Sequence, residues 1–146
     1  MDEIRTQHLE REAASWAAFE AALSRIPRER WAEEGVLPDW SVNDLLWHVA
    51  GWADRCAENL ERLHDGRTGP VEETDEQVDA MNAAFAAAAK GMDADAVWTG
   101  LVAARGLACR RFEELDETDP AAVEWFVGET YEHYEEHQAD LERFAG

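Results

Sequence analysis

Apolar residues recur at the 3.6-residue spacing of an α-helix along most of this sequence. Four long segments show the pattern, at about residues 2–25, 42–64, 93–115 and 120–144, and a shorter alanine-rich segment spans 74–90. No segment shows the sustained apolar–polar alternation, bounded by turn residues, that is typical of a hairpin. The pattern therefore predicts an all-α chain in which the long helices pack as an antiparallel bundle.

Helix start signals support two of these boundaries. Ser41 and Asp44 have the spacing of a capping box, with Asp in place of the usual Glu. Asp119 and Pro120 fit an N-cap residue followed by the first helical residue. We therefore expect the second and the last long helices to begin at these two positions.

Other residues mark connections and weak points. Residues 27–40 are expected to form a connection, and residues 65–73 a loop. Gly100 and Gly106 lie inside the predicted helix over 93–115, where each costs about 1 kcal/mol relative to alanine. Their presence there indicates close packing or a bend.

Length and charge limit the classes of function. The 146 residues correspond to one domain, residues 1–146, and the 46% hydrophobic content favours a packed core over disorder. The 13 basic and 33 acidic residues give a net charge of −20, which disfavours binding to nucleic acid or to an anionic membrane surface. The expected ligand is therefore a small molecule.

No targeting or membrane segment stands out. No apolar run approaches the ~20 residues that span a bilayer, and the first residues lack the apolar stretch of a signal peptide. Cys56 and Cys109 each lie within a helical pattern, so we expect reduced, buried, structural thiols. A cytoplasmic location is the resulting expectation.

The histidines are the strongest chemical signal. His133 and His137 are spaced i, i+4, so a helix places both rings on one face, and that face continues into the apolar stripe through Leu141 and Phe144. His48 lies on the buried stripe of the helix over 42–64. Such histidines are either satisfied core residues or metal ligands, because neutral imidazole is a common ligand. In a bundle the three rings can converge, and three imidazoles leave coordination positions open, as in a catalytic metal site.

Three rival motifs fit poorly. His133 to His137 matches the pattern H-x-x-E-H, but the proteases with that pattern take a third ligand from an acid well downstream, and only nine residues follow His137. A ferritin-like di-iron site needs two Glu-x-x-His motifs, and only the segment 61–64 fits. A serine hydrolase needs a G-x-S-x-G elbow, which the sequence lacks. His8 and His64 have no partner at ligand spacing.

Three segments, in order along the chain, resemble the signatures of the DinB/YfiT-like superfamily. The segment 40–52, WSVNDLLWHVAGW, is similar to its helix-2 signature, W-S-x-x-[DE]-hydrophobic-x-x-H-hydrophobic-x-x-W. The segment 78–82, VDAMN, resembles a stretch common in its mycothiol- and toxin-protection-like members, and 130–137, TYEHYEEH, resembles T-Y-x-H-Y-x-x-H. The resemblance implies a four-helix bundle with up-down-down-up topology. It also implies one divalent metal held by His48, His133 and His137.

The resemblance also implies classes of chemistry. Many members use a low-molecular-weight thiol such as mycothiol or bacillithiol, whereas others are hydrolases, including colibactin self-protection proteins that open a cyclopropane. The larger mycothiol-dependent maleylpyruvate isomerases carry a second, C-terminal domain, which we do not expect in these 146 residues. A homodimer is expected by analogy. Zn²⁺ or Ni²⁺ is the expected metal, with Fe²⁺ and Mn²⁺ open, since affinity alone does not separate them.

Catalytic residues are not identifiable from the sequence. The expected activity is delivery of a thiol or water to a small electrophile, with a non-catalytic metal- or ligand-binding protein as the alternative. Groups close enough in sequence to surround the metal ligands are Glu129, Tyr131, Glu132 and Tyr134, and candidate pocket-lining residues are Trp47, Trp52 and Trp125. Each of these has the simpler alternative of a packing or solvated position.

Overall fold

The computed structural model describes residues 2–66, 72–115 and 119–146. The described elements, in chain order, are α1 (Glu3–Ser24), the 3₁₀ turn η1 (Arg28–Arg30), β1 (Glu34–Leu37), β2 (Trp40–Ser41), α2 (Val42–His64), α3 (Asp75–Ala89), α4 (Ala94–Glu113), α5 (Pro120–Glu129) and α6 (Tyr131–Ala145). Helices dominate, so the prediction of an all-α chain is confirmed.

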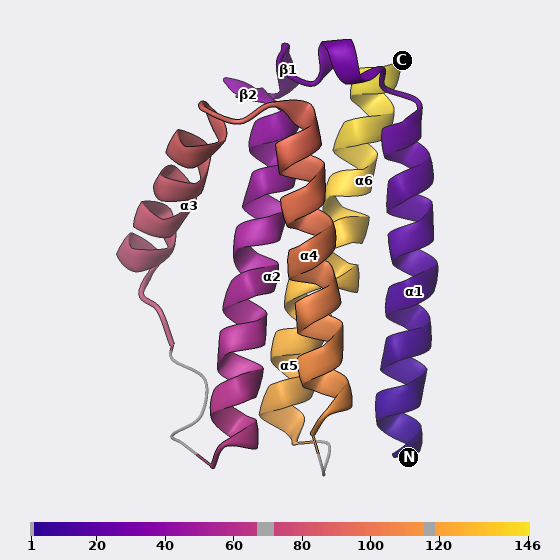
Figure 1. Ribbon diagram of the computed structural model, residues 1–146, viewed down its shortest axis with the longest axis vertical. Helices are drawn as coiled ribbons and strands as arrows, with labels where there is room; N and C mark the ends of the chain where they lie inside the picture. Colours follow the sequence, from indigo (N-terminus) through magenta and orange to yellow (C-terminus); the bar gives the residue numbers. More distant parts are fainter. Residues whose placement is uncertain (1, 67–71, 116–118) are drawn as a thin grey trace.

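The long helices form a bundle with the expected topology. In Figure 1, α1 runs upward, α2 and α4 run downward side by side, and α5 and α6 run upward one after the other. Helix α3 lies outside the bundle, against α2, and carries the chain back to the top before α4 begins. The order is therefore up-down-down-up, with α3 as the crossover between the two descending helices.

The capping signals in the sequence do what their spacing predicts. The backbone N–H of Ser41 donates to Asp44 Oδ2 at 2.9 Å, and the N–H of Asp44 donates to Ser41 Oγ at 3.2 Å. Asp119 caps α5, since its Oδ1 accepts from the N–H of Ala121 at 2.7 Å and Pro120 follows as the first helical residue. Both helix starts are confirmed.

The connection over residues 27–40 is more ordered than predicted. Strands β1 and β2 form a short antiparallel hairpin, in which Leu37 pairs with Trp40 and Glu34 with Ser41. Asp39 has φ of 65°, in the left-handed region that Asp tolerates better than most residues. The strands span four and two residues, too few to show an alternating pattern in the sequence. The hairpin delivers Trp40 directly to the start of α2.

The last predicted helix is divided, which corrects the expectation of one continuous helix from about 120 to 144. Thr130, with φ of −117° and ψ of −100°, separates α5 from α6. Its hydroxyl donates to the carbonyl oxygen of Phe126 at 2.5 Å. A threonine that bonds back to the i−4 carbonyl competes with the regular backbone ladder and bends helices. The break falls one turn before His133.

Two glycines, Gly100 and Gly51, allow α4 and α3 to pack closely against α2. A Cβ atom at Gly100 of α4 would lie 2.4 Å from Cζ3 of Trp47, and one at Gly51 of α2 would lie 2.6 Å from the ring of Phe85 of α3. At Gly106 the nearest atom is Nη1 of Arg110, at 3.4 Å on the same helix. Close packing is thus confirmed at Gly100 and is not found at Gly106.

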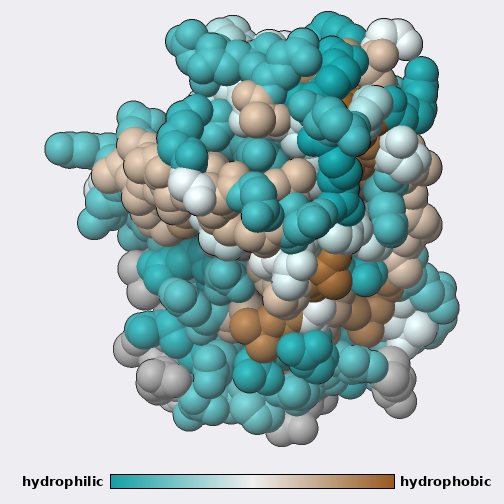
Figure 2. Space-filling view, turned by 45° about the horizontal axis from the view of Figure 1, so that its top comes forward, coloured by the Kyte–Doolittle hydropathy of each residue, from teal (hydrophilic) through white to brown (hydrophobic). Residues whose placement is uncertain are grey.

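The surface is mostly hydrophilic (Figure 2), as the strongly acidic composition predicts. Most of the face in Figure 2 is hydrophilic, and moderately apolar colour gathers over α3, whose second half is rich in alanine. Among the described residues, no helix combines the length and the apolar character needed to cross a membrane.

Candidate metal centre

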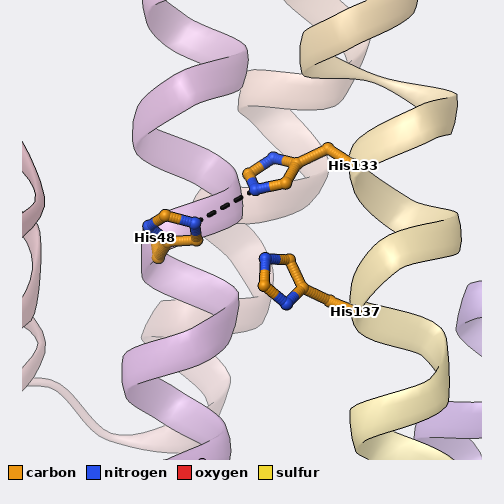
Figure 3. Close-up of side chains that lie close together, drawn as sticks. All are labelled: His48, His133 and His137. Carbon is orange, nitrogen blue, oxygen red and sulfur yellow. Dashed lines mark hydrogen bonds between the residues drawn. The ribbon is translucent and has the colours of Figure 1, made fainter. Parts of the chain in front are cut away.

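The three predicted histidines converge between two helices. His48 extends from α2, and His133 and His137 extend from α6 one turn apart, so all three rings meet in the space between these helices (Figure 3). One nitrogen from each ring lies within 4.8 Å of the others, and the Nε2 atoms of His48 and His133 are 3.0 Å apart. Three nitrogens at this separation are close enough to coordinate one metal ion.

Burial favours the neutral form of two of these rings, His48 and His133. His133 is 8% exposed and His137 is 7% exposed, whereas His48 is partly open. Burial, aided by His137, lowers the pKa of His48 to about 4 and that of His133 to about 3. Asn82 opposes the shift at His48 in part, although its amide makes no hydrogen bond of standard geometry to the ring. Neutral imidazole is the form that binds a metal.

The back nitrogens of the rings have different environments. Nδ1 of His137 lies 3.0 Å from Oδ2 of Asp140, and the other oxygen of Asp140 accepts from Arg143 at 2.6 Å. The Nδ1 atoms of His48 and His133 are buried and have no hydrogen-bonding partner among the described residues. Asp140 was not anticipated from the sequence, although its i+3 spacing from His137 places it one turn further along the same helix face.

A cavity of about 530 Å³ opens onto the histidines. Helix α3 contributes Val78 and Asn82, and the hairpin contributes Leu37 and Trp40. The ring of Trp40 lies 5.2 Å from that of His48. The remaining lining residues come mainly from α2, α5 and α6: His48, Trp52, Glu73, Trp125, Gly128, Glu129, His133, Glu136 and His137. The cavity thus combines aromatic faces, carboxylates and imidazoles.

The structure separates the predicted aromatic neighbours into two groups. Trp52 and Trp125 line the cavity as expected, whereas Trp47 packs toward Gly100 of α4. Tyr131 and Tyr134 turn away from the histidines toward α1, where their hydroxyl groups meet His8 and Glu12. These tyrosines are therefore packing residues. Trp40 was missed, although it opens the WSVND segment and immediately precedes the cap of α2.

The acidic residues near the histidines in sequence also differ in whether they line the cavity. Glu129 and Glu136 line the cavity, whereas Glu132 lines an adjoining hollow. Burial, together with the charges of Glu73 and Glu136, raises the pKa of Glu129 to about 7. Glu73 is paired with Arg55 at 2.8 Å. Glu129 is therefore a wall carboxyl that can exchange a proton near neutral pH.

The remaining histidines and cysteines lie away from the cavity lining. His8 packs on Tyr131 and bonds its hydroxyl at 2.9 Å, and His64 is exposed. Both cysteines are free thiols; Cys56 is buried, whereas Cys109 is half-buried rather than buried as predicted. Burial raises the pKa of both thiols, that of Cys109 to about 12, so they stay protonated and unreactive.

Comparison with known families agrees with the geometry. The model of the mycothiol maleylpyruvate isomerase N-terminal domain matches residues 13–133. The chain belongs to this family. The family is part of the DinB/YfiT-like superfamily, so the predicted membership of that superfamily is confirmed. No curated protein and no solved structure gave a match.

The chemistry of the donor set fits a divalent metal. The match to the mycothiol maleylpyruvate isomerase N-terminal family includes His48 and His133, and His137 follows one turn later. Three imidazole nitrogen donors suit Zn²⁺, Ni²⁺ or another first-row ion, and leave room for an exogenous ligand. The three histidines could therefore hold one metal ion.

Proposed function

We propose that this protein binds one divalent metal ion through His48, His133 and His137 and activates a thiol against a small electrophile in the adjoining cavity. The observation that carries the proposal is the convergence of three imidazoles at the wall of a cavity of about 530 Å³. A cavity of that volume lies within the usual range of small-molecule binding sites. A divalent ion held there supplies Lewis acidity that lowers the pKa of a thiol or water ligand.

The cavity walls supply the other functions that such a reaction needs. Trp40, Trp52 and Trp125 offer aromatic faces for the apolar part of the electrophile. Glu129, with a pKa of about 7, accepts the proton that the thiol or water loses. Glu129 and Glu136 also repel carboxylates, so a thiol without net negative charge is the expected cosubstrate. This favours a mycothiol-type thiol over glutathione.

The metal site is tested with alanine variants of the three histidines. Each of His48→Ala, His133→Ala and His137→Ala is expected to lose at least about 100-fold in metal affinity, because loss of an outer partner alone costs 10–100-fold. His64→Ala, a change at an exposed histidine of the same helix as His48, is the matched control and should keep one ion per chain. Elemental analysis of protein prepared without an affinity tag is the measurement. Full stoichiometry in all three variants would contradict the site.

The chemistry is tested with a panel of electrophiles, with and without mycothiol, bacillithiol or glutathione. Metal-dependent conjugation that His137→Ala abolishes supports the transferase. Turnover without thiol instead assigns a hydrolase, as in the toxin-protection branch of the superfamily. If neither occurs, spectral shifts of the Co²⁺-substituted protein on adding ligands indicate a binding protein. A Co²⁺ spectrum that thiols and small ligands leave unchanged contradicts an open coordination position.

A further inference from the structure

The three histidines are not equivalent, because only His137 has a partner on its back nitrogen. Its Nδ1 lies 3.0 Å from Oδ2 of Asp140, whereas the Nδ1 atoms of His48 and His133 are buried without a partner among the described residues. Asp140 is held from its other side, since Arg143 donates to Oδ1 at 2.6 Å. The Asp140 side chain is 15% exposed, so it is largely shielded from competing water.

This contact selects one tautomer of His137. A carboxylate only accepts hydrogen bonds, so a hydrogen must be on Nδ1 of His137, and in the neutral ring it is the single N–H. Nε2 of His137 then keeps its lone pair, which is the form a metal ligand needs. The ring orientation is fixed by the same contact, because Asp140 and His137 lie one turn apart on α6.

The other two rings are held differently. The Nε2 atoms of His48 and His133 are 3.0 Å apart, so in the metal-free protein one of them donates its Nε2 hydrogen to the other. The donating ring has no lone pair on Nε2. Before both rings can bind one ion through Nε2, that hydrogen must leave Nε2, and Nδ1 of the same ring must take up a proton.

We propose that Asp140 is a positioning residue that makes His137 the preorganised ligand of the site, while the His48–His133 pair changes its tautomers on metal binding. The proposal rests on the proposed metal site, but its first prediction concerns the metal-free protein. Outer carboxylates that accept from a ligand histidine fix its tautomer and orientation in many metal sites. Here the structure assigns that role to one residue and one ring.

The first test is long-range ¹H–¹⁵N correlation of the imidazoles in metal-free protein. His137 should show a single tautomer with hydrogen on Nδ1, and one of His48 and His133 should carry hydrogen on Nε2. In Asp140→Asn, Arg143 takes the amide oxygen and the amide NH₂ faces Nδ1, so His137 should shift toward the Nε2–H tautomer. Affinity for Zn²⁺, measured by chelator competition, should fall about 10–100-fold.

Two further variants separate positioning from loss of charge or of folding. Glu142→Gln removes an α6 carboxylate that accepts a hydrogen bond from Gln138, and it should leave both the tautomer and the affinity unchanged. Asp140→Asn combined with Arg143→Gln frees the amide oxygen to accept from Nδ1 again, so it should recover part of the affinity. Circular dichroism should show folded protein in every case.

The outcomes distinguish this proposal from the metal site itself. A mixture of tautomers at His137 in the wild-type protein, or an affinity in Asp140→Asn equal to that of Glu142→Gln, would overturn the role of Asp140 even if the metal binds. A wild-type protein with the expected tautomers but without metal affinity would instead overturn the proposed function and leave the assignment of the His137 tautomer standing.

Discussion

Helix α6 takes part in two buried polar clusters of opposite character. The ion-pair cluster consists of Glu12 of α1, Arg105 of α4 and Tyr134 of α6. Glu12 is 1% exposed and accepts from Arg105 at 2.6 and 2.8 Å and from the Tyr134 hydroxyl at 2.9 Å. The guanidinium of Arg105 also lies over the ring of Trp16, 5.2 Å from its centroid. The carboxylate of this cluster has partners on both oxygens.

The histidine cluster, formed by His48, His133 and His137, is only partly satisfied. It shares α6 with the ion-pair cluster, since His133 and Tyr134 are adjacent residues. Two of its ring nitrogens are buried without a partner among the described residues. Buried polar atoms in native folds are normally paired, so these two Nδ1 atoms leave the histidine cluster less completely hydrogen-bonded than the ion-pair cluster. Only the histidine cluster borders the cavity of about 530 Å³.

The difference between the two clusters indicates that α6 has a structural role on one face and a ligand-binding role on the other. A closed network with a bidentate arginine orients three helices relative to one another. The open network next to it keeps lone pairs and space for an exogenous ligand. The ion-pair cluster therefore positions α6, and the histidine cluster uses that position.

The largest expected effect is the loss of folding stability when the ion-pair cluster is broken. Glu12→Ala leaves Arg105 without its carboxylate and Tyr134 without its acceptor. Loss of one partner from a buried pair costs 3–5 kcal/mol, and we expect about 3 kcal/mol here because the Arg105 side chain is 27% exposed. Urea denaturation of metal-free protein measures this change. Glu10→Ala removes an exposed carboxylate from the same helix and is the control; equal stability of the two variants would refute the structural role.

The sequence predicted what local patterns determine. Helical periodicity and capping residues such as Ser41 and Asp119 depend on neighbours within one turn, so these helices and starts are confirmed. The histidine cluster was predictable because the i, i+4 spacing of His133 and His137 places both rings on one face, and His48 lies on a second apolar stripe.

The rest depends on contacts that spacing does not show. Glu12 and Arg105 are 93 positions apart, and nothing near either residue indicates the pairing. The break at Thr130 arises from one side-chain hydrogen bond within an otherwise helical pattern. Asp140 has a usable signal, its i+3 spacing from His137, but it is one of 33 acidic residues, so spacing alone does not single it out.

The second-largest expected effect is a loss of folding stability at acidic pH, caused by the buried rings of His48 and His133. The pKa values of about 4 for His48 and about 3 for His133 lie below the value near 6.5 expected in the unfolded chain. The unfolded chain therefore binds more protons between these values, so stability from these rings is complete above about pH 6.5 and is lost as the pH falls. Metal-free wild-type protein should lose about 2 kcal/mol more than His133→Gln between pH 7 and pH 4.5, since one pKa unit corresponds to about 1.4 kcal/mol.

Urea denaturation at several pH values, with chelator present, measures this difference. His64→Gln changes an exposed histidine and should follow the wild-type curve. Parallel curves for the wild type and His133→Gln would show that the His133 ring is not held neutral by the fold.

The smallest expected effect compares two glycines of α4, one packed against Trp47 of α2 and one next to Arg105 of the ion-pair cluster. A Cβ at Gly100 would lie 2.4 Å from Trp47, the neighbour of His48, so overpacking of about 1–3 kcal/mol should exceed the helix gain of about 1 kcal/mol. At Gly106, beside Arg105, the nearest atom is the flexible end of Arg110 at 3.4 Å. Gly100→Ala should therefore lower the melting temperature and weaken metal binding, whereas Gly106→Ala should raise the melting temperature and leave binding unchanged. The same sign for both variants would mean that the contact between Gly100 and Trp47 is not tightly fitted.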